Sequence, residues 1–205
     1  MNPKRVDVGA RFAVFPFYEG GSVEPGARIP ILIGHGRAFG SGEHETTASC
    51  LEEIERIAGA GPGMEDGLRG LAVLDLGSGT GILAIAAARL GAARVTAVEP
   101  DPEAFEAGGR NFSLNGLGNA VETIRGEIGS VRGRRFDLVL ANIYGDVLLP
   151  IAPDVSALLR PRARLILSGV HYDYAYDIKK AYTEAGLTLA WSRALENYCT
   201  FVLVR

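Results

Sequence analysis

Residues 73–87 read VLDLGSGTGILAIAA, and this stretch decides the fold. Its apolar beginning is typical of a strand buried on both faces, and its alanine-rich end predicts a helix. Gly77, Gly79 and Gly81 lie between the two. Glycines at such a turn let the backbone come close to a ligand, and the free N–H groups of the first helical turn favour an anion. The stretch therefore predicts a ligand site where a buried strand passes into a helix.

The spacing of these glycines separates two kinds of nucleotide site. The dinucleotide fingerprint G-x-G-x-x-G would place the third glycine at position 82, one residue later than Gly81. Asp75 precedes the first glycine by two residues. The pattern D-x-G-x-G-x-G resembles motif I of the class I methyltransferases, which implies a loop under the methionine part of S-adenosylmethionine. The alternative is the pyrophosphate site of an NAD-dependent oxidoreductase, and the early third glycine counts against it.

Strands and helices alternate around this loop. Strands are predicted at residues 71–76, 94–99, 121–124, 136–141 and 165–167, and helices at 82–90, 102–114, 146–159 and 173–185. The last two strands, 187–194 and 199–204, are joined by a short loop and should pair antiparallel. Such alternation implies right-handed crossovers and a mostly parallel sheet. We expect a doubly wound, Rossmann-like α/β fold of the class I methyltransferase type, with seven strands and a C-terminal antiparallel hairpin.

The segment before the main sheet has a different pattern. It predicts short strands at residues 12–17 and 29–33, a helix at 44–58 and a glycine-rich loop at 59–67. We expect residues 1–40 to form a β extension that packs on the core. Residues 41–205 are then expected to form the methyltransferase domain.

Two later strands end in acidic segments at the edge of the sheet where ligands bind in folds of this kind. Glu99, followed by Pro100, ends the second strand and lies 22 residues after Gly77. A carboxylate there can accept both ribose hydroxyls of S-adenosylmethionine or of NAD, so it indicates a nucleoside without choosing between them. A solvated acid at a strand end is the alternative. Glu127 follows the third strand and is a candidate contact for the adenine.

Asn142 ends the fourth strand at the same edge. Its side-chain oxygen can accept a hydrogen bond from an amine and so aim the nitrogen lone pair at the methyl group of a sulfonium. Such a displacement depends mainly on alignment, and no dedicated base for the amine is evident. A turn-forming asparagine is the alternative. Tyr144 is a candidate for lining the methyl-acceptor pocket, or else an aromatic side chain that packs beneath a loop.

Residues 39–51, FGSGEHETTASCL, form the approach to the first helix. The hydroxyls of Thr46 and Thr47 can bond a ligand carboxylate or cap the helix. We expect His44 to be a cap or a surface contact rather than a catalytic base.

The longer segment FGSGEHETTASCLEEIE, residues 39–55, resembles the hallmark of the PrmA family, the enzymes that methylate ribosomal protein L11. That family typically reads FGTG-x-H-x-TT-x-x-CL here. Residues 28–40, 74–105 and 138–161 resemble the approach to this motif, the cofactor core and the strand-end asparagine segment of the same family. The likeness extends from about residue 10 to residue 205.

The resemblance implies S-adenosylmethionine as the cofactor, with contacts from Thr47, Gly77, Glu99 and Asn142. The expected catalytic residues are Asn142 and Tyr144. The full set of expected cofactor-binding residues is Phe39, Gly40, Thr46, Thr47, Asp75, Gly77, Ser78, Gly79, Gly81, Glu99, Pro100, Glu127 and Asn142.

The chain also departs from the pattern of the family. Glu99 stands where the family usually has aspartate, which can make the same contact with a shorter reach. Residues 142–145 read Asn-Ile-Tyr-Gly where Asn-Ile-Leu-Ala is common, and residues 161–163 replace a Pro-Gly-Gly turn. The sequence does not contain the N-terminal domain with which typical members recognise the ribosomal protein. It is therefore either the catalytic part of a longer protein or a shorter relative with another substrate.

The charge and composition of the chain indicate which kinds of partner it can bind. The net charge of −3 argues against a nucleic-acid partner, and the short basic run at residues 132–135 is expected to form a surface turn. No apolar run approaches the ~20 residues that span a membrane, and no secretory signal is evident, so we expect a cytoplasmic protein. Cys50, Cys199 and three histidines lack metal-ligand spacing. We expect two buried thiols and no metal site.

These observations predict an S-adenosylmethionine-dependent N-methyltransferase of PrmA type. Its substrate would be a lysine or N-terminal amine of a protein such as ribosomal protein L11. Two alternatives remain open. The same core could methylate another protein, a small molecule or a nucleic acid, or the chain could be a cofactor-binding module without activity. The oligomeric state is left open.

Overall fold

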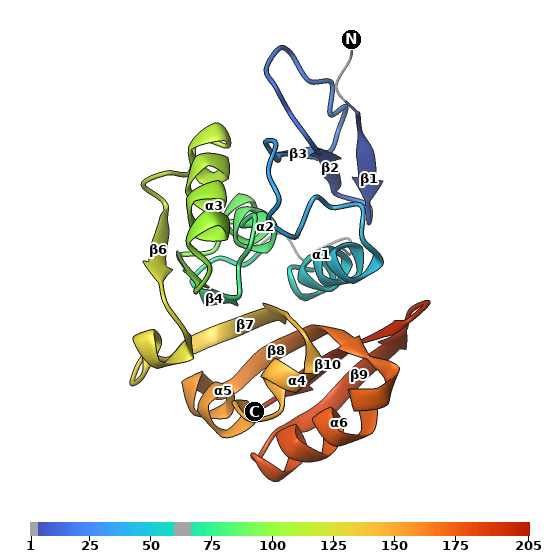
Figure 1. Ribbon diagram of the computed structural model, residues 1–205, viewed down its shortest axis with the longest axis vertical. Coiled ribbons are helices and arrows are strands. Elements are labelled where there is room, and N and C mark those ends of the chain that lie inside the picture. The colour runs from blue at the N-terminus through green and yellow to red at the C-terminus, as the bar shows by residue number, and fades with distance from the viewer. Residues whose placement is uncertain (1–3, 60–66) are drawn as a thin grey trace.

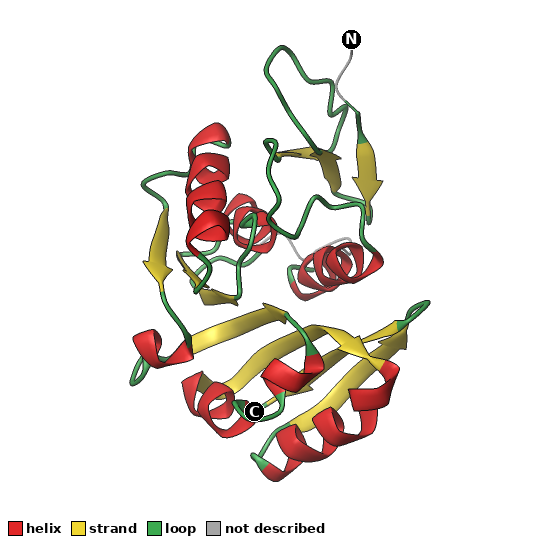
Figure 2. Ribbon diagram, in the orientation of Figure 1, coloured by secondary structure: helices red, strands yellow, loops and turns green. Residues whose placement is uncertain are grey.

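A seven-stranded sheet forms the centre of the computed structural model, which describes residues 4–59 and 67–205 (Figures 1 and 2). The strand order is β6-β5-β4-β7-β8-β10-β9. β10 runs antiparallel to β8 and β9, and the other neighbouring pairs are parallel. The strands are β4 (Ala72–Leu76), β5 (Arg94–Glu99), β6 (Val121–Arg125), β7 (Phe136–Asn142), β8 (Leu159–His171), β9 (Thr188–Ala194) and β10 (Tyr198–Val204). The predicted doubly wound fold with its antiparallel hairpin is confirmed.

Two layers of helices cover the sheet, and each layer buries an apolar face (Figure 1). One layer consists of α1 (Glu45–Ile57), α2 (Ile82–Arg89) and α3 (Pro102–Leu114). The other consists of α4 (Gly145–Leu148), α5 (Ala152–Leu158) and α6 (Ala175–Glu184). Because both faces of β4 and β7 are covered, these strands are apolar almost throughout. The carboxyl ends of the parallel strands therefore provide an edge at which polar groups can gather.

A small second sheet packs on the α1 and α2 side of the molecule. Its strands are β1 (Val6–Val8), β2 (Phe12–Phe15) and β3 (Ile29–Leu32), in that order. The two predicted strands are confirmed, and β1 was missed because three residues give no usable periodicity. The second sheet adds buried side chains to the same apolar cluster as α1 and α2.

Two predicted elements differ from the structure. The single helix predicted at 146–159 is two short helices, because Pro150 and Pro153 cannot continue a helical hydrogen-bond ladder. The strand predicted at 165–167 is the 13-residue β8. Its beginning carries arginines and a proline, which hide a strand pattern. Pairing with β7 at Leu159 and again from Arg164 onward includes this segment in the strand despite its polar sequence, with an irregularity between the two at which Arg162 has a φ of 66°.

The two cysteines, the lengths of the helices and the glycine-rich loop were further expectations from the sequence. Cys50 and Cys199 are both buried with free thiols, as predicted. Burial raises the pKa of the Cys50 thiol to about 12. None of the helices in the described ranges combines the length and the apolar character needed to cross a membrane. The glycine-rich loop predicted at 59–67 lies, apart from its two end residues, outside the described residues.

Candidate functional site

The glycine loop turns sharply at the end of β4. Gly77, Gly79 and Gly81 have φ angles of 69°, 54° and 79°, in the region that L side chains rarely adopt. A Cβ atom at Gly77 would lie 2.4 Å from Cγ2 of Ile143. The Gly77 N–H donates to the carbonyl of Val98 over 2.8 Å, which ties the loop to β5. The loop therefore needs glycine for its backbone conformation and for the close approach of the β7 end.

A segment far away in the sequence covers this loop. The Thr80 N–H donates to the carbonyl of Phe39 over 3.0 Å, and the Thr80 hydroxyl donates to the carbonyl of Gly40 over 2.7 Å. Asn111 on α3 supports the pair: its amide donates to the Thr80 carbonyl and its oxygen accepts from the Gly34 N–H. The segment that precedes α1 is thereby fixed against the glycine loop.

Glu99 is held at the tip of β5 by backbone donors. Its side chain is buried, and its two oxygens accept from the N–H groups of Gly79 (2.8 Å) and Asp101 (3.0 Å). A carboxylate has about four lone-pair positions, so each oxygen keeps the capacity for one further hydrogen bond. The carboxylate is therefore oriented before any ligand arrives.

Asp75 is a second carboxylate at this edge, at the end of β4. Its side chain is only 1% exposed and accepts a hydrogen bond from the Ala84 N–H in the first turn of α2. Burial raises the pKa of Asp75 to about 7, with a smaller increase from the charge of Glu99. The hydrogen bond from Ala84 opposes that increase. Asp75 therefore titrates near neutral pH.

The N-terminus of α1 faces the same space. His44 is the N-cap, and its ring nitrogen accepts from the Thr46 N–H and lies 2.8 Å from the Thr46 hydroxyl. This confirms the expected capping role of His44. Thr46 and Thr47 are buried, and the Thr47 hydroxyl lies 3.4 Å from Nδ2 of Asn142. The hydroxyls of α1 thus contact the tip of β7.

Asn142 carries an unused acceptor. Among the described residues, its Oδ1 atom is buried and has no hydrogen-bond partner. The backbone of Gly169 lies opposite, with φ at 74°, and a Cβ there would lie 3.1 Å from that oxygen. Any side chain at position 169 would therefore crowd the Asn142 amide.

These groups share one cavity of about 390 Å³. Its predicted lining residues are Phe39, Gly40, Thr46, Thr47, Asp75, Gly77, Ser78, Gly79, Glu99, Pro100, Asn142 and Tyr144. Two predicted residues do not line it. Gly81 caps α2 against the ring of Phe112, and Glu127 is exposed at the start of the 3₁₀ helix η1 (Ile128–Val131). Most of the predicted site residues thus line one small cavity, which lies between three strand ends and the N-terminus of α1.

The structure adds residues that the sequence did not indicate. The cavity is also lined by His44, Ile82, Leu83, Ala104, Ile143, Val147, Gly169 and Tyr198. Phe39, His44 and Tyr198 form a row of edge-to-face ring contacts, with centroids 5.1 and 5.5 Å apart. Tyr198 lies on the terminal hairpin, far from every motif in the sequence. No sequence signal could have found it, because only the pairing of β10 with β8 brings it to the cavity.

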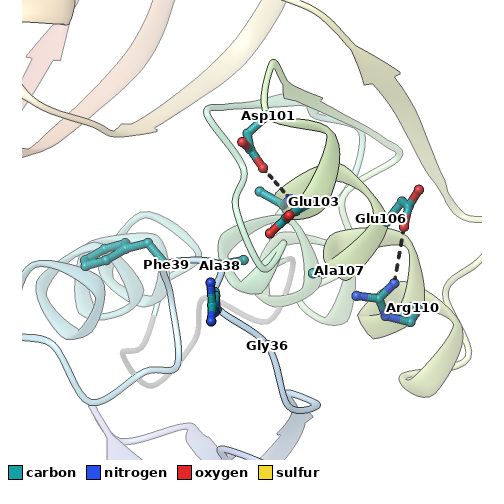
Figure 3. Close-up of a pocket in the computed structure, with 10 residues that line it drawn as sticks. Gly36, Ala38, Phe39, Asp101, Glu103, Glu106, Ala107 and Arg110 are labelled. Atoms are coloured by element: carbon teal, nitrogen blue, oxygen red, sulfur yellow. Dashed lines mark hydrogen bonds and ion pairs between the residues drawn. The ribbon is translucent and has the colours of Figure 1, made fainter.

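A second cavity, of about 550 Å³, lies between residues 36–39 and one face of α3 (Figure 3). Charged side chains of α3 point toward it, including Glu103 and Arg110 (Figure 3). It shares only Phe39 and Ala104 with the first cavity. Neither the glycine loop nor Asn142 reaches it, so it lacks the convergent groups of the first cavity.

Comparison with known proteins assigns the family. The family described as "Ribosomal protein L11 methyltransferase (PrmA)" matches residues 2–205. The chain belongs to the PrmA family. The resemblance that the motifs indicated is thereby confirmed.

Named relatives of PrmA type agree with this assignment. A ribosomal protein L11 methyltransferase from Geotalea daltonii is 36% identical over 192 residues, which covers 91% of this chain and 59% of that protein. The protein of the same name from Pelobacter propionicus is 42% identical over 172 residues, which covers 82% of this chain and 53% of that protein. The chain therefore spans about three-fifths of the length of the curated PrmA relatives it matches.

A solved PrmA structure has the same fold. The ribosomal protein L11 methylase from Lactobacillus delbrueckii subsp. bulgaricus superposes with a TM-score of 0.82 at 28% identity, covering 98% of this chain and 97% of that one. An RNA methyltransferase from Salinibacter ruber, solved with S-adenosyl-L-homocysteine, is more distant. It superposes with a TM-score of 0.58 at 19% identity, which covers 76% of this chain and 90% of that one. That likeness concerns the fold alone.

Proposed function

We propose that this chain is an S-adenosylmethionine-dependent N-methyltransferase that methylates amino groups of ribosomal protein L11. Membership of the PrmA family supports the reaction class and the substrate. The observation that carries the proposal is the shared cavity, in which Glu99, Gly77 and Asn142 meet although they end three different strands. Convergence of such groups in one concave space is what a nucleoside-binding enzyme requires.

The residues present fit the cofactor. A cavity of about 390 Å³ is within the usual range for small-molecule sites. Glu99 would hold the ribose hydroxyls, because its two oxygens are oriented and each retains an acceptor position. Asp75 and the buried hydroxyls of Thr46 and Thr47 would face the methionine part, where a carboxylate can pair with an ammonium group. When bound, the cofactor supplies the methyl group on a sulfonium, which is a good leaving group.

Asn142 would orient the methyl acceptor. A buried amide oxygen without a partner costs about 1–3 kcal/mol, so Oδ1 of Asn142 is suited to accept a hydrogen bond from an incoming amine. Gly169 leaves room for the Asn142 amide, and the Thr47 hydroxyl lies beside the amide nitrogen, Nδ2. Tyr144 lines the cavity and is 67% exposed, so it would border the path of the acceptor side chain. The protein then contributes alignment rather than bond-breaking chemistry.

The test separates binding from transfer. Calorimetry should show that Asn142→Ala binds S-adenosylmethionine within about threefold of the unchanged chain. Methyl transfer from labelled cofactor to purified ribosomal protein L11 should fall at least about 100-fold, because the amine is no longer aligned. Asn119→Ala is the matched control, since Asn119 is exposed and does not line the cavity, and it should change neither quantity.

The outcomes distinguish the parts of the proposal. A chain that binds neither S-adenosylmethionine nor its demethylated product would contradict the whole proposal. Binding with transfer of label to a different component of a cell lysate would leave the reaction in place and replace the substrate. Binding without transfer to any fraction would favour a cofactor-binding module without activity.

A further inference from the structure

Seven arginines gather at the end of the sheet opposite the cavity. They come from the turn before β7, from the beginning of β8 and from the residue after β10. We call this set the arginine edge, and it comprises Arg132, Arg134, Arg135, Arg160, Arg162, Arg164 and Arg205. All are exposed except the half-buried Arg160. In Figure 1, the turn before β7, α5 and the C-terminus lie in the same part of the molecule.

Contacts between these segments place the arginines close together. Arg160 pairs with Asp137 at the start of β7, over 2.5 Å. The Arg205 guanidinium donates to the carbonyl of Leu159 over 2.9 Å, where α5 ends and β8 begins. A small hollow beside α5 is lined by Arg132 and Arg135 together with one acidic residue of α5, Asp154. Three separate stretches of sequence therefore form one surface.

This surface is distant from the cavity. Asn142, which lines the cavity, and Phe136, which follows the arginine turn, are the two ends of β7. A seven-residue strand is about 20 Å long. The arginine edge therefore does not belong to the site described above, and its role does not depend on the proposed methyl transfer.

The positive charge of the edge is only partly balanced. Within the described parts of the chain, Glu122 pairs with Arg134 and Asp137 with Arg160, while Arg132, Arg162 and Arg164 have no side-chain hydrogen bond or ion pair. The chain as a whole has a net charge of −3, so its charge is strongly segregated. A locally positive surface attracts anions and raises their association rate.

The chemistry of the edge favours phosphate. The three stretches that form the edge, residues 132–135, 160–164 and 205, contain arginine and no lysine, and the planar guanidinium of arginine matches phosphate in two-point hydrogen bonds. No large exposed apolar side chain among the described residues belongs to this set or its turn, which argues against insertion into a lipid surface and against stacking of bases. The turn before β7, the beginning of β8 and the residue after β10 belong to strands that are neighbours in the sheet, so the arginines form one continuous row that a flexible single-stranded backbone can follow.

We propose that the arginine edge binds the phosphate backbone of single-stranded RNA without reading its bases. This runs against the expectation drawn from net charge alone. That expectation counted residues 132–135 as a short isolated run, whereas the fold adds four further arginines to it.

The experiment measures fluorescence anisotropy of a labelled 20-nucleotide RNA of mixed sequence with the unchanged chain at about 50 and 200 mM salt. The edge variant combines Arg132→Gln, Arg135→Gln and Arg164→Gln. It should weaken binding at least about tenfold and lower the salt slope by about 2, because each phosphate contact on a single strand contributes about 0.7. The control Arg110→Gln, Lys179→Gln, Lys180→Gln removes the same charge from exposed positions outside the edge and should change binding less than threefold.

A second variant with lysine at the same three edge positions should restore part of the affinity, because it keeps the charge and loses the two-point geometry. Its urea denaturation midpoint should equal that of the unchanged chain. Three outcomes would overturn the proposal. They are no salt-dependent binding at low salt, an equal loss in the edge and control variants, or tighter binding to phosphatidylserine vesicles than to RNA.

Discussion

Burial changes the acid–base chemistry of Asp75. The side chain lies beneath the glycine loop with one hydrogen bond from the backbone, and its pKa rises to about 7. In the unfolded chain the pKa returns to its ordinary value near 3.8. The folded state therefore holds a proton that the unfolded state has lost, between about pH 4 and pH 7. Stability contributed by this protonation is present below that window and is lost as the pH rises through 7.

The variant Asp75→Asn should remove this pH dependence. Between pH 4.5 and 7.5 the free energy of unfolding of the unchanged chain should fall relative to that of the variant, by about 3 kcal/mol. The difference between the two pH profiles reports the contribution of the Asp75 carboxyl group, since the substitution removes only that titratable group. Urea denaturation at the two pH values measures it. Parallel pH profiles would show that the carboxylate titrates normally.

Arg162 carries backbone strain that its sequence position conceals. Its φ of 66° lies in the left-handed region, at a turn where the family pattern has glycine. Arg162→Gly should stabilise the chain by about 1 kcal/mol, because the strain is removed and the Arg162 side chain makes no hydrogen bond to any residue that the structure describes. Arg164→Gly is the matched control in regular strand and should destabilise by about 0.5–1 kcal/mol. Thermal denaturation of both variants measures these changes in stability. Equal changes in the melting temperature would show that the Arg162 backbone is not strained.

At the scale of elements, the site depends on how separate segments are tied together. Asn111 on α3 bonds the Thr80 carbonyl and the Gly34 N–H, and Asn115, the C-cap of α3, bonds both backbone groups of Leu32. α3 therefore links the small N-terminal sheet to the glycine loop. These two asparagines gave no signal in the sequence, since a polar residue on an amphipathic helix is usually solvated.

The glycine loop itself allows a sharp test. Gly77→Ala combines left-handed strain with a Cβ 2.4 Å from Ile143, whereas Gly70→Ala has similar strain (φ 77°) and nothing within 4 Å. Gly70→Ala should lose about 1–2 kcal/mol of stability, and Gly77→Ala should lose more because the Ile143 side chain must also move. Only Gly77→Ala should also weaken binding of S-adenosylmethionine, by at least about tenfold, because the displaced Ile143 adjoins Asn142. Calorimetry with each variant measures this, and equal affinities would show that the loop adapts.

At the scale of the whole molecule, residues 4–40 share an apolar core with α1, α2 and the main sheet. We propose that this segment is a β extension of the 41–205 domain rather than an independent unit. Val8, Phe12, Val14 and Ile31 belong to the same buried cluster as α1, α2 and part of β4. One contiguous core is typical of one cooperative unit.

Phe12→Ala tests this cooperativity. Phe12 is fully buried, so its truncation should cost about 3–5 kcal/mol. The single tryptophan, Trp191, lies on β9 at the far edge of the sheet, and its fluorescence should report the same lowered urea midpoint as circular dichroism. The exposed Phe17→Ala should shift the midpoint little. A separate early transition that leaves Trp191 unchanged would show that residues 1–40 unfold alone.

The alternating strands and helices, the glycine loop, the strand-end positions of Glu99 and Asn142, and the family could all be predicted from the amino-acid sequence. These features follow from local periodicity and from contiguous motifs, because short-range sterics and burial patterns act along the chain. The remaining features become visible in the folded chain alone. The long β8, the place of Tyr198 at the cavity, the raised pKa of Asp75 and the arginine edge arise where segments far apart in sequence meet. Hydrogen bonding between strands, desolvation and summed charge depend on distance in space, which no local pattern records.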